Sequence, residues 1–76
     1  MKKISLACLK AGHKGKISEV SGGRGIVNKL MNMGLYKGKE VIKISHMGLK
    51  GPVVIKAGRS ILALGHGIAV KIIVEE

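Results

Sequence analysis

The residues best suited to chemistry in this sequence are three histidines and one cysteine. His13, His46, His66 and Cys8 are its only soft metal ligands. They do not form the paired ligand motifs of a structural zinc site, and a single cysteine cannot form an internal disulfide. Only convergence in the folded chain could still bring them together. The sequence therefore predicts no bound metal and no cofactor, and it favours a reducing, cytoplasmic setting.

The acidic side chains are too few and too scattered for catalysis. The chain has no aspartate, and its four carboxylates are Glu19, Glu40, Glu75 and Glu76. General acid and base roles need two positioned groups, and an activated nucleophile needs an adjacent base. Neither arrangement is visible in the sequence. We therefore predict a protein that is not an enzyme.

A glycine-rich stretch, GGRG at residues 22–25, precedes an expected helix and raises the question of phosphate binding. Free N–H groups at a helix start attract anions. However, a phosphate-binding P-loop ends in GK[ST], and a dinucleotide fingerprint reads G-x-G-x-x-G. Neither pattern is present. We interpret Arg24 in this stretch as a surface contact.

The net charge of +10 favours an anionic partner, such as nucleic acid, a membrane surface or an acidic protein. Sequence-specific nucleic-acid recognition is disfavoured, because twelve of the fourteen cations are lysines and Tyr36 is the only aromatic residue. The lysines are also scattered, as solvated outward positions of strands would be. No apolar run approaches the roughly 20 residues that span a bilayer.

A change in hydrophobic periodicity separates a first strand from a short helix. Residues 16–21 (KISEVS) lie between glycines and suit a strand. Apolar residues then recur at helical spacing and define one face: Ile26, Val27, Leu30, Met31 and Met33. Gly34 can end the helix in a left-handed conformation, with Leu35 folding back on Leu30 as in a Schellman motif. Because a helix of about nine residues is unstable alone, we expect it to pack on the strands.

The second half of the chain predicts four further strands. Residues 39–46 are expected to direct Ile42 and Ile44 inward and Lys43 outward, by the alternation of a half-buried strand. In residues 52–57 the same alternation places Val53 and Ile55 inside. Gly58 suits a two-residue hairpin turn, so residues 52–57 should pair with residues 60–64.

The C-terminal segment completes the predicted architecture. Residues 65–69 leave room for about one helical turn, and the last strand, 70–76, should direct Val70, Ile72 and Val74 inward. The predicted fold is thus all-β, a small closed five-stranded barrel with one short inserted α-helix and a single-turn connector before the last strand. We expect residues 1–76 to form one domain.

Three longer stretches resemble the FeoA family along nearly the whole chain. LACLKAGHKG contains the opening L-x-x-L-x-x-G-x-x-G, MGLYKG contains the elbow M-G-L-x-x-G, and ALGHGIAVKI contains the close A-L-G-x-G-x-A-x-K-I. The resemblance implies an SH3-like barrel with an inserted helix. It also implies a cytoplasmic accessory protein for FeoB, the GTPase-linked ferrous-iron transporter of bacterial membranes.

We therefore expect a non-catalytic adaptor that binds and modulates this transporter, either as a monomer or as a weak homo-oligomer. It would meet the membrane only through its partner and would not bind nucleic acid. The candidate partner-binding residues lie in the helix, in the elbow after it and in the loop before Pro52, where exposed methionine suits an adaptable surface: Arg24, Lys29, Met33, Leu35, Tyr36, Lys37, Met47 and Leu49.

Two alternatives remain open at this level, because a small barrel does not define a function. The first is a nucleic-acid-binding barrel whose lysines contact phosphates: Lys14, Lys16, Lys37, Lys39, Lys43 and Lys50. The second is a stand-alone relative of the similar barrel at the end of some metal-dependent repressors, which would hold a peptide or sister domain in a groove.

Overall fold

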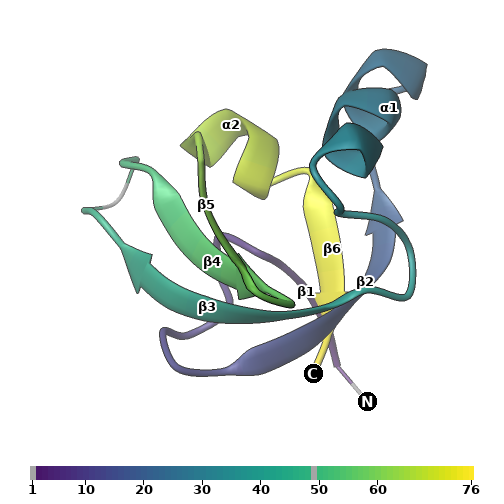
Figure 1. The fold of residues 1–76 in the computed structure, drawn as a ribbon. Helices are drawn as coiled ribbons and strands as arrows, with labels where there is room; N and C mark the ends of the chain where they lie inside the picture. Colours follow the sequence, from purple (N-terminus) through teal and green to yellow (C-terminus); the bar gives the residue numbers. More distant parts are fainter. Residues whose placement is uncertain (1, 49) are drawn as a thin grey trace.

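Six antiparallel strands form one strongly curled sheet in the computed structural model, which describes residues 2–48 and 50–76 (Figure 1). The strands are β1 (Lys3–Ser5), β2 (Lys14–Val20), β3 (Glu40–His46), β4 (Val53–Ala57), β5 (Ser60–Leu64) and β6 (Ile72–Glu75). Helix α1 (Arg24–Asn32) connects β2 to β3, and the single turn α2 (His66–Ala69) connects β5 to β6. None of the described helices is long and apolar enough to cross a membrane.

The predicted all-β fold with one inserted helix and a single-turn connector is confirmed, with one strand more than predicted. β1 is the addition, and it pairs with β6 through Lys3 opposite Glu75 and Ser5 opposite Ile73. A three-residue strand is too short to show a period, which explains why the sequence concealed it. The strand order is β1-β6-β2-β3-β4-β5, so β1 and β5 are the edges of a barrel-like sheet that is not closed by strand pairing among the described residues.

Helix α1 ends as its sequence predicts. The N–H of Leu35 donates to the carbonyl of Leu30 at 2.8 Å, and the N–H of Gly34 donates to that of Met31 at 3.0 Å. Gly34 has φ of 85°, the left-handed conformation that a Schellman stop requires. Leu30 and Leu35 are both buried, so the stop fixes the helix on the core. Met31, predicted on the buried face, is instead 53% exposed.

The predicted orientation of β3 is wrong. Val41 and Lys43 point into the barrel, whereas Ile42 is half-buried and Ile44 is exposed. A register shift between Lys43 and Ser45 marks a bulge, after which His46 pairs with the buried Val53. Val41 and Ile42 are both apolar, so the sequence allowed either phase, and a one-residue change of phase exchanges the two faces.

The hairpin of β4 and β5 forms as predicted, with Ala57 opposite Ser60 across a two-residue turn. Near the C-terminus, Ile72 and Val74 are buried as predicted. Val70 is not, because it lies at the end of α2 and is exposed.

The hydrophobic core fills the space inside the curled sheet and under α1. It consists of aliphatic residues from the N-terminal segment, every strand from β2 to β6 and both helices: Leu6, Leu9, Ile17, Leu30, Leu35, Val41, Val53, Ile55, Ala57, Leu64, Ala69, Ile72 and Val74. The helix contributes one fully buried side chain, Leu30, with Ile26 and Met33 packed partly against the core. Its remaining surface is available for contacts.

Candidate protein-binding surface

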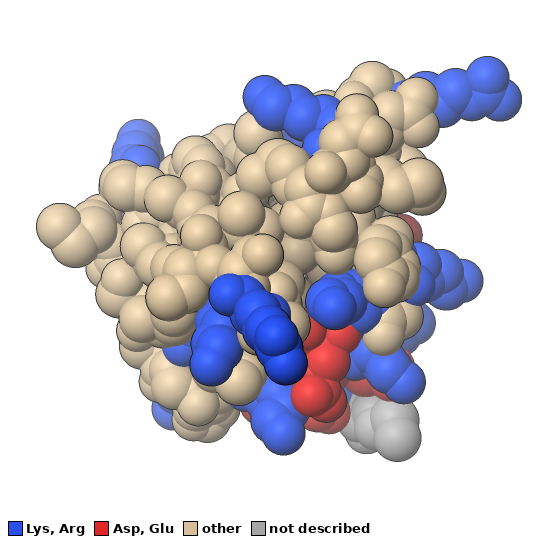
Figure 2. All heavy atoms as spheres, viewed as in Figure 1, with Lys and Arg blue, Asp and Glu red and all other residues tan. Residues whose placement is uncertain are grey.

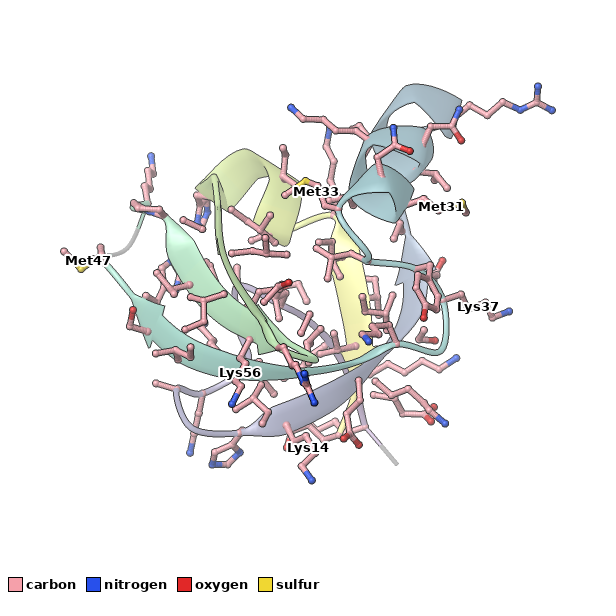
Figure 3. All side chains as sticks on the ribbon, in the orientation of Figure 1. Lys14, Met31, Met33, Lys37, Met47 and Lys56 are labelled. Carbon is pink, nitrogen blue, oxygen red and sulfur yellow. The ribbon has the colours of Figure 1, made fainter. Side chains whose placement is uncertain are left out.

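The helix residues predicted to contact a partner divide into two flanks. Each residue advances an α-helix by about 100°. Arg24 and Met31 are seven positions apart and therefore share one flank, whereas Lys29 and Met33, four apart, share the other. Figure 3 shows Met31 on the side of α1 that faces away from α2, and Met33 between α1 and α2. These residues do not form the single face that the sequence predicted.

The elbow after α1 extends the flank of Met31. Tyr36 is 45% exposed, and Lys37 lies on the same side of the molecule as Met31 (Figure 3). Leu35, in contrast, is buried in the core and cannot contact a partner from this position. We call the surface formed by Arg24, Met31, Tyr36 and Lys37 the helix–elbow surface. It combines two exposed apolar side chains with two cations.

The loop between β3 and β4 lies elsewhere. Met47, 64% exposed, is on the opposite side of the molecule from Met31 and Lys37 (Figure 3). Leu49, the other predicted contact in this loop, lies outside the described residues. The structure therefore does not join Met47 to the helix–elbow surface.

Burial and nearby carboxylates set apart two of the lysines proposed as phosphate contacts, Lys43 and Lys14. Lys43 is only 2% exposed and cannot reach a phosphate from the barrel interior. Lys14 lies with its Nζ 3.9 Å from the Oε1 of Glu40. Both residues line an open hollow of about 360 Å³ that also contains Glu75 and Glu76. Because positive and negative charges alternate there, this surface is not a basic groove for a nucleic-acid backbone.

A small polar cluster lies inside the barrel, on one side of the aliphatic core. The Nζ of Lys43 donates to the carbonyl of Ala7 at 2.9 Å and lies 3.3 Å from the Nδ1 of His46. The His46 ring stacks on that of His66, with centroids 5.7 Å apart. His46 Nε2 and His66 Nδ1 are buried without a hydrogen-bond partner among the described residues. The cluster thus ties β3 to α2 and to the turn around Ala7.

Burial lowers the pKa of Lys43, because it penalises the charged ammonium, and the proximity of Cys8 raises it by a smaller amount. An ammonium donating to His46 Nδ1 leaves the imidazole proton on Nε2. In the described part of the chain, no three or more His, Cys, Asp or Glu side chains are grouped as a metal site would need. The contacts of the cluster position β3, α2 and the turn around Ala7 relative to one another.

Sequence reasoning missed an apolar surface on the outer face of the sheet. Ile42, Ile44, Val54, Ile61 and Ala63 are half-buried or exposed residues of β3, β4 and β5. The strand register places them on one face: Val54 lies beside Ala63, whereas the exposed Lys56 lies between Ile42 and Ile61. We call these five residues the outer apolar patch. The signal was available in SILAL at residues 60–64, where both phases of the strand are apolar.

Comparison with known proteins agrees with this fold and with the motifs. Residues 4–76 match the family model described as the FeoA domain. "Putative Fe(2+) transport protein A" of Methanocaldococcus jannaschii is 34% identical over 71 residues, which cover 93% of this chain and 84% of that protein.

Solved structures extend the comparison. A crystal structure of an iron uptake regulatory protein (FeoA) has a TM-score of 0.88 and 29% identity, covering 99% of this chain and 97% of that one. A manganese-dependent transcriptional repressor has a TM-score of 0.86 at 15% identity, covering 95% of this chain and 40% of the repressor. At that identity the repressor shares the fold alone. These neighbours support the SH3-like fold.

Proposed function

The chain belongs to the FeoA family, and on that basis we propose that it is a non-catalytic accessory protein of ferrous-iron uptake. In this proposal it binds the cytoplasmic part of a FeoB-type transporter and modulates its GTPase or permease activity. The match of residues 4–76 to the family model is the observation on which the proposal rests. The name of the Methanocaldococcus jannaschii relative, which refers to Fe(2+) transport, supports the same process.

The helix–elbow surface is our candidate for the contact. Met31 and Tyr36 are large and exposed, and such residues supply most of the affinity at protein interfaces. Arg24 and Lys37, the two cations of this surface, would steer an acidic partner and would make association salt-dependent. A surface with only two large exposed apolar side chains fits a small, transient interface rather than a permanent one.

The test is a titration of isotope-labelled protein with the GTPase domain of the transporter, followed by amide chemical shifts. We expect saturable shifts in residues 24–37 that persist at 0.15 M salt. Tyr36→Ala should weaken binding by about tenfold, as an aromatic anchor does. Lys37→Glu should weaken it more than Lys29→Glu, because both reverse one charge but only Lys37 lies on the helix–elbow surface.

The alternative outcome is that the protein binds nucleic acid instead of the GTPase domain. Mixed-sequence single strands should give shifts that scatter over surface lysines and disappear as salt rises, since phosphate contacts are lost with added counterions. If saturable shifts arise only with nucleic acid, or if Lys29→Glu and Lys37→Glu behave alike, the proposed contact is wrong. The buried position of Lys43 already removes one of the lysines that the nucleic-acid alternative requires.

A further inference from the structure

The two edges of the sheet differ in how well they are protected. Natural sheets protect their edges with short strands, charges, prolines or bulges. β1 has three residues, begins with Lys3 and pairs with β6. β5 has five residues, SILAL, with no charge, proline or bulge, and its Ile61 is 65% exposed. An apolar edge of this kind is either an aggregation hazard or a binding site.

The register of the hairpin shows which backbone groups of β5 are free. In a two-residue hairpin, the residues next to the turn form a hydrogen-bonded pair, and such pairs alternate with non-hydrogen-bonded ones. Ala57 and Ser60 flank the turn. The alternation therefore directs the N–H and C=O groups of Ile61 and Ala63 away from β4, and none of the described hydrogen bonds of loops and turns uses them. An added strand forms its hydrogen bonds with outward N–H and C=O groups that recur at every second residue, as those of Ile61 and Ala63 do.

The side chains of the same two residues lie on the outer face. Ile61 and Ala63 belong to the outer apolar patch, which continues onto β4 through Val54, the partner of Ala63. An extended segment lying along β5 would gain backbone hydrogen bonds from the edge. Every second side chain of that segment would lie beside the patch. β5 thus offers backbone hydrogen bonds, which give affinity, and an apolar face, which favours a segment with alternating apolar residues.

Charge distinguishes between possible occupants. Cations gather near the turn between β4 and β5: Lys56 opposes Ile61, Arg59 lies in the turn, and the Nζ of Lys39 approaches Gly58. Figure 2 shows a largely uncharged surface over β4, β5 and α2, with blue side chains along its lower rim. Three of the four glutamates of the chain, Glu40, Glu75 and Glu76, line the hollow beside β2, and Glu19 lies on β2 itself.

A second copy of the chain would bring together two chains with a net charge of +10 each, which disfavours it as the occupant. We propose that β5 binds an extended segment of a different protein as an additional strand. This segment alternates apolar and polar residues and has Asp or Glu at the end that meets the β4–β5 turn. The inference goes beyond the proposed function, because it uses a surface other than the helix–elbow surface.

The test uses the full chain and a defined probe. The probe is an acetylated ten-residue peptide that alternates valine with threonine and ends in three glutamates. Saturable amide shifts should centre on residues 60–64, and hydrogen exchange should slow at Ile61 and Ala63. Two counterparts serve as controls: one has lysine for glutamate, and the other has N-methyl groups on the backbone nitrogens that face β5. Both should bind at least tenfold more weakly.

Variants separate this site from the helix–elbow surface. Ala63→Pro removes one outward N–H without touching the pairing with β4, and it should weaken peptide binding about fivefold, the value of one hydrogen bond. Ile61→Ser removes the exposed apolar side chain without adding a charge and should weaken it at least tenfold. Met31→Ser makes the matched apolar-to-polar change on α1 and should leave peptide binding unchanged while weakening the GTPase-domain contact. Circular dichroism checks that each variant folds.

Three results would overturn the inference. The first is an N-methylated peptide that binds as well as the parent, because the attraction would then be electrostatic only. The second is the absence of saturable shifts in residues 60–64. The third is sedimentation of the free protein as a dimer in which Ile61 and Ala63 are already protected, because the occupant would then be a second copy. None of these results bears on the transporter contact, which the Lys37→Glu and Lys29→Glu pair tests separately.

Discussion

The docking of α1 on the barrel depends mainly on its one fully buried side chain, so Leu30→Ala should be severely destabilising. Leu30 is fully buried and is the helix residue to which the Schellman stop attaches. The substitution removes three carbon groups, which at about 0.8 kcal/mol each amounts to about 2.4 kcal/mol of lost burial. A cavity that only partly collapses raises the expected loss to about 3 kcal/mol. A chain of 76 residues is expected to have about 4–11 kcal/mol in total.

The assay is equilibrium urea unfolding followed by far-ultraviolet circular dichroism, with a thermal scan beside it. A loss of about 3 kcal/mol in a domain of this size lowers Tm by about 12–24 °C. Met31→Ala is the matched control, because Met31 is the adjacent helix residue and is exposed; its effect should stay within about 0.5 kcal/mol. If Leu30→Ala destabilises no more than Met31→Ala, the helix is not held on the core by Leu30 and the reasoning fails.

Two further predictions concern a glycine pair and the buried lysine. Gly34→Ala should lower the free energy of unfolding by about 1–2 kcal/mol, since alanine is strained at φ of 85°. Gly25→Ala should raise it by about 0.5 kcal/mol, because an added Cβ there meets no atom within 4 Å. Equal changes of Tm for Gly34→Ala and Gly25→Ala in thermal scans would contradict this prediction. For Lys43, whose pKa is lowered by burial, the unfolded state binds more protons between the folded pKa and the unfolded value near 10.5. The free energy of unfolding should therefore rise with pH in that window. Lys43→Met should abolish that rise, and parallel pH profiles for the two proteins would refute it.

Local sequence signals determined the elements whose hydrogen bonds are local. The end of α1 at Gly34 and Leu35, the two-residue turn at Gly58 and the single turn after Leu64 all follow from residues within a few positions of one another. Glycine at a left-handed position and helical or alternating periodicity act over that range. The inward faces of β4 and β6 followed from the same alternation. These signals, with the family motifs, were sufficient for the fold class.

Long-range packing decided the rest. Lys43 lies inside the barrel because a carbonyl 36 positions earlier, that of Ala7, accepts a hydrogen bond from its Nζ, and a bulge after it changes the phase of β3. No local period encodes such a partner. The division of the helix residues into two flanks, the separation of Met47 from Met31 and the outer apolar patch also depend on how strands distant in sequence are placed. Sequence alone thus determined which segments form both helices and every strand except β1. Only the tertiary structure decided which side chains remain exposed for a partner, because exposure depends on every segment that packs around a residue.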